Sequence, residues 1–145
     1  MKTDFKKIFL DTATIIYYLD KDSLLYDECA EIFNSLAKNN ARFITSTVTC
    51  AEYLVYPYRI KNSEAADIFW RFLDECKIPV CKIDTEIAVK AAQIRAEYVH
   101  FKTAAALQLA TACVCGCDLF LTNDKQLKNF KEISCATVEE WSLEQ

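Results

Sequence analysis

The chain has 145 residues, of which 52% are apolar and 26% are charged, and its net charge is −4. This composition is typical of a soluble globular protein with one domain, here expected over 1–145. It argues against a membrane protein, because no apolar run approaches roughly 18 residues, and against a basic protein that coats nucleic acid. The first apolar run is also too short for a signal peptide, so we expect a cytoplasmic protein.

The first half of the chain predicts two strands and four helices. A short apolar run predicts a buried strand at 7–10, and helical patterns follow at 12–20 and at 24–38, where Asn39-Asn40 ends the second helix. The next strand is expected at 42–45. Helices follow at 48–60, with Ser46 or Thr47 as N-cap, and at 64–76, opened by Asn62-Ser63.

The second half predicts three more strands. They lie at 78–81, 118–121 and 132–136. Between and after them we expect helices at 85–98, capped by Asp84, at 104–115, capped by Thr103, at 125–129 and at 138–143, with Gly116 in a left-handed conformation. Strands separated by helices pair in parallel. The sequence therefore predicts an α/β fold, a three-layer α/β/α sandwich around a central parallel five-stranded sheet.

Acidic residues follow two of these strands. Asp11 comes directly after the first strand, and Asp124 follows the fourth. In open α/β sheets the ligand crevice lies beyond the carboxyl ends of the strands, so the two carboxylates can meet there. Glu52 lies one turn into the helix after the second strand and can lean over the same edge. Converging carboxylates suit a hard cation such as Mg²⁺ or Mn²⁺, although each acid can instead be a helix cap or a solvated charge.

Polar residues flank these acids. Thr12 follows Asp11, and Thr122 and Asn123 precede Asp124. Their hydroxyl and amide groups can orient the carboxylates or bind a phosphate oxygen. The alternative is ordinary hydrogen bonding at the strand ends, and we favour the functional interpretation for Thr122.

The cysteines and the single histidine give little sign of a site. Most of the eight cysteines lie in apolar runs, where a reduced thiol behaves as a small hydrophobic side chain. Cys113, Cys115 and Cys117 do not have the usual spacing of zinc ligands. We expect His100 at the surface or at a helix end.

Five segments together resemble the PIN-domain proteins. They are Phe9-Leu10-Asp11-Thr12, Ala51-Glu52, Ile94-Arg95-Ala96, the run TAAALQLATA from Thr103 to Ala112, and Leu121-Thr122-Asn123-Asp124. Their order and spacing over about 7–136 are similar to those of the single-domain VapC-type toxins of bacterial toxin–antitoxin pairs. The resemblance implies a PIN-like fold and a Mg²⁺- or Mn²⁺-dependent endoribonuclease. It also implies an RNA substrate and a cognate antitoxin whose C-terminal segment fills the active-site groove.

The chain departs from this family at one position. Ala105 stands where the family pattern has an acid, which leaves Asp11, Glu52 and Asp124 as metal ligands, with Glu52 also a candidate general base. Either a toxic enzyme was disarmed by an Asp→Ala change, or the chain is a naturally degenerate, non-catalytic PIN domain that binds RNA or protein. We expect poor Mg²⁺ binding and little cleavage. A phosphohydrolase of the HAD type is disfavoured, because Ala13 stands where that chemistry needs a second Asp.

The remaining expectations concern contacts with partners. Arg95 and Lys102 bracket the approach to the helix that carries Ala105, so they are candidates for RNA binding, although each can be a solvated charge. A homodimer is plausible because the segments 48–60 and 64–76 are rich in aromatic residues, which are common at interfaces. These residues, which can equally belong to the core, are Tyr53, Tyr56, Tyr58, Phe69 and Trp70.

Overall fold

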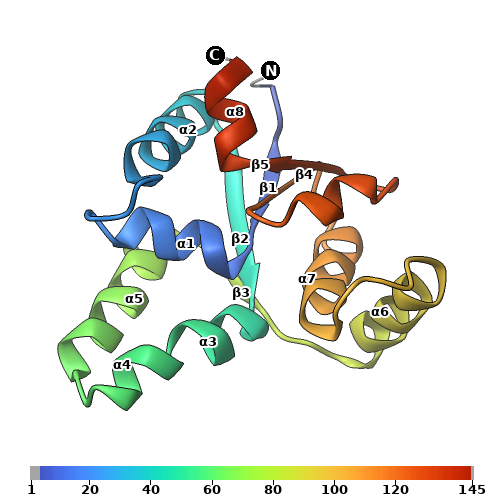
Figure 1. Cartoon of the computed structure of the whole chain (residues 1–145), viewed down its shortest axis with the longest axis horizontal. Coiled ribbons are helices and arrows are strands. Elements are labelled where there is room, and N and C mark those ends of the chain that lie inside the picture. Colours follow the sequence, from blue (N-terminus) through green and yellow to red (C-terminus); the bar gives the residue numbers. More distant parts are fainter. Residues whose placement is uncertain (1–3, 145) are drawn as a thin grey trace.

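Five parallel strands form the centre of the computed structural model, which describes residues 4–144. The strands are β1 (Lys7–Leu10), β2 (Arg42–Ser46), β3 (Val80–Cys81), β4 (Leu119–Thr122) and β5 (Ser134–Thr137), and their order across the sheet is β3-β2-β1-β4-β5. The predicted parallel five-stranded sheet is confirmed (Figure 1).

Helices cover both faces of this sheet. They are α1 (Thr12–Leu19), α2 (Tyr26–Lys38), α3 (Thr47–Tyr53), α4 (Val55–Arg59), α5 (Ser63–Glu75), α6 (Thr85–Glu97), α7 (Thr103–Val114), the 3₁₀ helix η1 (Lys125–Asn129) and α8 (Val138–Glu144). Side chains of α1, α2, α5 and α8 share one apolar core, and those of α6, α7 and η1 share the other. In Figure 1 the first group lies mainly to the left of the sheet and above it, and the second lies to the right.

The central strand β1 shows how the sequence builds both cores. Ile8 and Leu10 enter one core and Phe9 enters the other, because successive side chains of a strand point to opposite faces. All three are fully buried, and Phe9 stacks on Phe120 of β4 with ring centroids 5.0 Å apart. Burying a side chain of this size contributes roughly 1.5–3 kcal/mol, so β1 and β4 are firmly anchored where they end at the acids.

The predicted helix at 48–60 is wrong in one respect. The structure divides it into α3 and α4 at Leu54. Pro57 explains the break, because it has no N–H to donate to the carbonyl of Tyr53 and its ring crowds that carbonyl. The break leaves Glu52 in the last turn of α3, close to the sheet edge.

Other boundaries differ by one or two residues. Thr103 is the first residue of α7 rather than its cap, since Ala106 N–H donates to the carbonyl of Lys102 (2.9 Å). Strand β3 is shorter than 78–81, because Pro79 cannot donate a ladder hydrogen bond. Strand β4 begins after Asp118, whose carboxylate instead accepts the backbone N–H groups of Lys6 and Lys7 (2.9 Å each).

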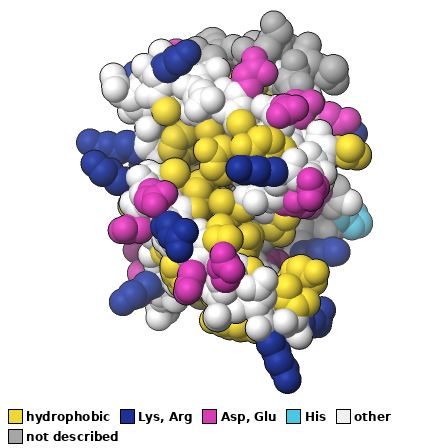
Figure 2. All heavy atoms as spheres, turned by 90° about the vertical axis from the view of Figure 1, so that its left-hand side faces the viewer, with side chains coloured by type: hydrophobic (Ala, Val, Ile, Leu, Met, Phe, Trp, Pro, Cys, Tyr) yellow, Lys and Arg dark blue, Asp and Glu magenta, His cyan; other side chains and the backbone are white. Residues whose placement is uncertain are grey.

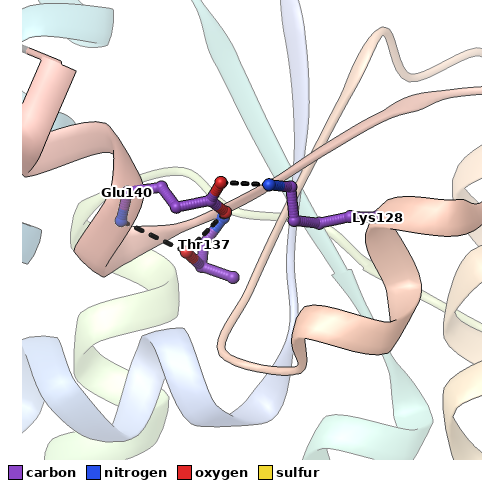
Figure 3. A network of polar contacts seen from close by, with 3 residues as sticks. All are labelled: Lys128, Thr137 and Glu140. Atoms are coloured by element: carbon purple, nitrogen blue, oxygen red, sulfur yellow. Dashed lines mark hydrogen bonds and ion pairs between the residues drawn. The ribbon is translucent and has the colours of Figure 1, made fainter.

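A capping box holds the last helix against the end of the sheet. The Thr137 hydroxyl accepts the N–H of Glu140 (3.2 Å) and donates to its carboxylate (2.8 Å), and Lys128 of η1 pairs with the same carboxylate (Figure 3). The box ties α8 to η1, the helix that follows Asp124.

Several smaller predictions are confirmed. Ser46, Asn62 and Asp84 cap their helices, and Gly116 has a φ of +74°, a conformation that glycine adopts without strain. His100 is exposed in the α6–α7 loop. All eight cysteines, each within the described residues, are free thiols. No helix within residues 4–144 is long and apolar enough to cross a membrane.

Candidate active site

A cavity of about 400 Å³ opens beyond the carboxyl ends of β1 and β4. It brings together Asp11, Glu52 and Asp124, which come from three distant parts of the sequence. Its lining is completed by Thr12, Ala13, Ile16, Lys102, Ala104, Ala105, Gln108 and Phe120. The three predicted acids therefore do lie around one space.

Asp11 is half-buried and caps α1. Its carboxylate accepts the N–H and the hydroxyl of Thr14, both at 3.0 Å, so the cap interpretation is correct. Burial raises the pKa of Asp11, hydrogen bonds from Thr122 and Thr14 oppose this rise, and the negative charge of Glu52 adds to it. An ionised Asp11 is thus disfavoured here, and a bound cation would relieve that penalty.

Glu52 reaches the cavity from α3 and is held by Thr12. The hydroxyl of Thr12 donates to a carboxylate oxygen of Glu52 at 2.6 Å, although the two residues are 40 positions apart. Thr12 itself opens α1, directly after Asp11. The end of β1 therefore positions two of the three acids. Asp11 directly follows the strand, and the hydroxyl of the next residue, Thr12, holds Glu52.

Gln108 of α7 is the residue that the sequence analysis missed. Its side chain is only 3% exposed, and its amide nitrogen lies 2.9 Å from the Thr49 hydroxyl and 3.4 Å from the Thr12 hydroxyl. Its amide oxygen accepts the hydroxyl of Ser46. A polar side chain within the apolar run Ala104–Ala112 was the available signal, since a buried amide needs partners.

The ends of this buried network fix the direction of its hydrogen bonds. The Thr45 hydroxyl lies 2.8 Å from the carbonyl of Leu10, which can only accept, and an ionised Glu52 can likewise only accept from Thr12. Each threonine has one hydroxyl hydrogen, so Thr12 must receive its own bond from another donor. The amide nitrogen of Gln108 has two hydrogens and can supply both Thr49 and Thr12.

The opposite side of the cavity is more open. Asp124 is exposed, and its carboxylate accepts the backbone N–H of Gln126 (3.0 Å) as the cap of η1. The buried Thr122 hydroxyl accepts the N–H of Asp124 (3.0 Å), which is ordinary hydrogen bonding at a strand end, and neither Thr122 nor the exposed Asn123 lines the cavity.

Helix α7 contributes position 105 and a lysine. Ala105 lines the cavity together with the three acids, so a longer side chain there would face them. Lys102, just before α7, also lines the cavity. Arg95 is exposed in the last turn of α6 and is not part of the lining.

The donor set suits a hard cation only in part. Carboxylate oxygens are the ligands that Mg²⁺ and Mn²⁺ prefer. Within the described residues, however, no three His, Cys, Asp or Glu side chains are close enough to hold one ion. The acids share the cavity without forming a complete ligand group, and position 105 contributes no carboxylate.

Comparisons with known proteins identify the family and the fold of the chain. A model of the PIN domain family matches residues 8–133, and no curated protein sequence matches. The fold is similar to that of VapBC2 from Rickettsia felis bound to a promoter DNA fragment (TM-score 0.71, 17% identity, 90% of this chain and 98% of that chain).

Two further structures show the same fold. One is DNA-bound VapBC from Salmonella typhimurium (TM-score 0.66, 22% identity, 92% and 98%). The other is VapC20 from Mycobacterium tuberculosis, a toxin that cleaves the sarcin–ricin loop (TM-score 0.66, 15% identity, 88% and 98%).

Proposed function

Since this chain belongs to the PIN domain family, we propose that it is a metal-dependent endoribonuclease, the toxin of a toxin–antitoxin pair, impaired in this form by Ala105. One observation carries the proposal. Asp11, Glu52 and Asp124 line a single cavity, and the one family acid that is missing would also face it.

The proposed roles follow from the position of each side chain. Asp11 and Asp124 would hold Mg²⁺ or Mn²⁺, which supplies an activated water and neutralises charge on the phosphoryl oxygens. Glu52, oriented by Thr12, would share in holding the metal or accept the proton of the attacking water. Thr122 and Asn123 would support Asp124 at the strand end.

Two cations would guide RNA to the cavity. Lys102 lines it, and Arg95 lies at the end of α6, the helix that packs along α7. Either would bind a backbone phosphate, which is the usual source of affinity for nucleic acid. Together they offset the net negative charge of the chain near the cavity.

A ribonuclease assay tests the proposal. The chain and its Ala105→Asp variant are compared in Mg²⁺, in Mn²⁺ and in EDTA, on structured RNAs that include transfer RNA and the sarcin–ricin loop. We expect a metal-dependent gain of at least about 100-fold on restoring the acid, because loss of even a supporting residue of a metal site costs 10–100-fold. Val114→Asp, which places a carboxylate at the exposed far end of the same helix and outside the cavity, is the control and should stay inactive.

A non-catalytic PIN domain is the second candidate. The absence of a carboxylate at position 105 favours it, together with the absence of a complete metal-ligand group among residues 4–144. It predicts that RNA binding survives EDTA and that Ala105→Asp produces no cleavage. Cleavage by the original chain at the rate of the variant would contradict the proposed impairment.

An apolar surface supports the proposed protein partners, an antitoxin and a second copy of the chain. Figure 2 shows apolar side chains gathered on the face formed by the helices at the left of Figure 1. The exposed large apolar side chains of α1, α4 and α5 are Ile16, Val55, Tyr56, Tyr58, Ile68 and Trp70. Phe69, in contrast, is fully buried and stacks on Tyr53, so the aromatic residues divide between core and surface.

A further inference from the structure

A second cavity, of about 390 Å³, lies beside the first, between the α6–α7 loop and η1. Its lining includes Tyr98, His100, Phe101, Gln126 and Asn129. We propose that this cavity binds one unstacked nucleobase of the RNA, next to the phosphate held in the first cavity. The inference rests on the proposed function: the second cavity would select the RNA substrate by one of its bases.

The aromatic side chains form a fixed platform. Tyr98 and Phe101 stack with ring centroids 4.8 Å apart and planes 7° apart, and Phe130 packs edge-on against Tyr98 at 5.4 Å. The hydroxyl of Tyr98 accepts the N–H of Lys131 (3.2 Å), which holds the ring from its other end. Proteins recognise single-stranded RNA by stacking its bases on aromatic side chains, including the imidazole of histidine.

Polar side chains around this platform match the edge of a base. Gln126 and Asn129 are exposed on η1, and each amide can both donate and accept a hydrogen bond. Glu97, at the end of α6, also lines the cavity and can only accept when ionised. A carboxylate suits the exocyclic amino group of adenine, guanine or cytosine, a group that uracil lacks. We therefore expect uracil to bind most weakly.

The two cavities are adjacent, because residues that are consecutive in the chain or hydrogen-bonded to each other line both of them. Phe101 lines the second cavity and Lys102 lines the first. On the other side, the Asp124 carboxylate accepts the N–H of Gln126 at 3.0 Å. A nucleotide whose phosphate lies by Lys102 and Asp124 can therefore place its base, or that of its neighbour, on Tyr98.

Exposed lysines flank the second cavity, whose own lining contains Glu97 and no lysine or arginine. Lys125 opens η1 directly after Asp124, and Lys131 follows the packed Phe130. Both lysines are exposed, as is Lys102 between the cavities. In the proposed complex these lysines would attract the phosphates outside the second cavity, while its interior takes the uncharged base.

Nucleotide binding tests the cavity without any nuclease activity. AMP, GMP, CMP and UMP are titrated separately into the full chain and followed by amide chemical shifts. We expect the shifts to centre on residues 97–101 and 125–130, with UMP the weakest ligand. In a His100→Ala/Gln126→Ala double variant, the dissociation constant should rise by about 5-fold or more, since base stacking on an aromatic side chain has effects of this size or larger. Gln93→Ala, which removes an exposed amide side chain of α6 outside both cavities, should leave it unchanged.

Two results would overturn the inference. One is the absence of chemical-shift changes in these segments at millimolar nucleotide. The other is equal nucleotide affinity of the double variant and the original chain. Either result would favour an aromatic side chain of a protein partner as the occupant of this cavity. Cleavage mapping separates this from the proposed function. If Ala105→Asp does not cut RNA but nucleotides bind at residues 97–101, the ribonuclease proposal fails and the nucleobase site stands. If it cuts and the double variant keeps the same base preference beside the cut, the role in substrate selection is wrong.

Discussion

The two sides of the first cavity are built in opposite ways. On the Glu52 side the carboxylate is exposed, but the Thr12 hydroxyl that holds it at 2.6 Å belongs to a network with the buried Gln108 and the fully buried Thr49. The Asp124 side is an exposed carboxylate at the start of the 3₁₀ helix η1; it accepts the N–H of Gln126, and only the backbone N–H of Asp124 bonds to Thr122.

Because of this difference, the Glu52 side is oriented before a ligand binds, whereas Asp124 can change its position when a ligand binds. A satisfied buried network holds its members in one arrangement, so Thr12 and Glu52 are oriented before any ligand arrives. An exposed acid on a short turn moves at little cost. A cation between the two sides would therefore bind the pre-oriented carboxylate of Glu52, and the carboxylate of Asp124 would move to contact it.

Replacing Gln108 should have the largest effect on the Glu52 side. Gln108→Leu leaves the buried Ser46 hydroxyl hydrogen without its acceptor and removes a donor from Thr49, which keeps its contact with Thr45 (2.8 Å). An unsatisfied buried group costs about 1–3 kcal/mol, so we expect the free energy of unfolding to fall by about that amount. In the Ala105→Asp background, any cleavage should fall as well, because Thr12 loses a donor. Urea denaturation measures the first effect, and a loss below about 0.5 kcal/mol would show that the network does not hold this side.

Gln108→Glu keeps the shape and removes the donor. A carboxylate buried in this network has a raised pKa in the folded state, so the folded protein binds an extra proton. The stability of this variant relative to the original chain should therefore be lowest at neutral pH and recover as the pH falls through the raised pKa. A difference that does not change with pH would indicate that the side chain at position 108 leaves the buried network in this variant.

The sequence predicted the acids of the site better than the buried hydrogen-bond network that holds them. Apolar runs end at Asp11 and Asp124, and parallel strand order brings such ends to one edge, so the meeting of these acids could be inferred. Gln108 stood out as a polar residue in an apolar helix, which indicated a buried amide, but its role could not be inferred because its partners belong to other elements. The helix break at Leu54 could have been predicted from Pro57, but the helical pattern continues on both sides of it.

Neutralising the acids tests whether burial separates the two sides. Asn is as good an N-cap as Asp, so Asp11→Asn and Asp124→Asn remove charge and keep the cap. Burial raises the pKa of Asp11, so the folded state binds more protons than the unfolded state from about the ordinary value of 3.8 up to the raised pKa. Stability is therefore lost as the pH rises through this window.

We expect Asp11→Asn to raise the free energy of unfolding at pH 7 by about 0.5–2 kcal/mol, the gain typical of relieving a strained functional residue. It should also flatten the fall of stability with pH that begins above the ordinary pKa of 3.8. Asp124→Asn, at an exposed position, should change stability by less than about 0.5 kcal/mol. Thermal and urea denaturation across this pH range measure both, and equal effects of the two variants would contradict the difference in burial.

The smallest effect should come from the cations on the open side. If Lys102 and Arg95 each neutralise one phosphate of a single-stranded RNA, replacing either by Ala should reduce the slope of log affinity against log salt by about 0.7. Lys38→Ala, an exposed change at the end of α2, should leave the slope unchanged. RNA affinity is measured at several salt concentrations in EDTA, which keeps any metal-dependent cleavage out of the comparison. A changed slope for Lys102→Ala alone would place the RNA backbone on the cavity rim and away from the end of α6, whereas unchanged slopes for both would mean that RNA approaches from the Glu52 side.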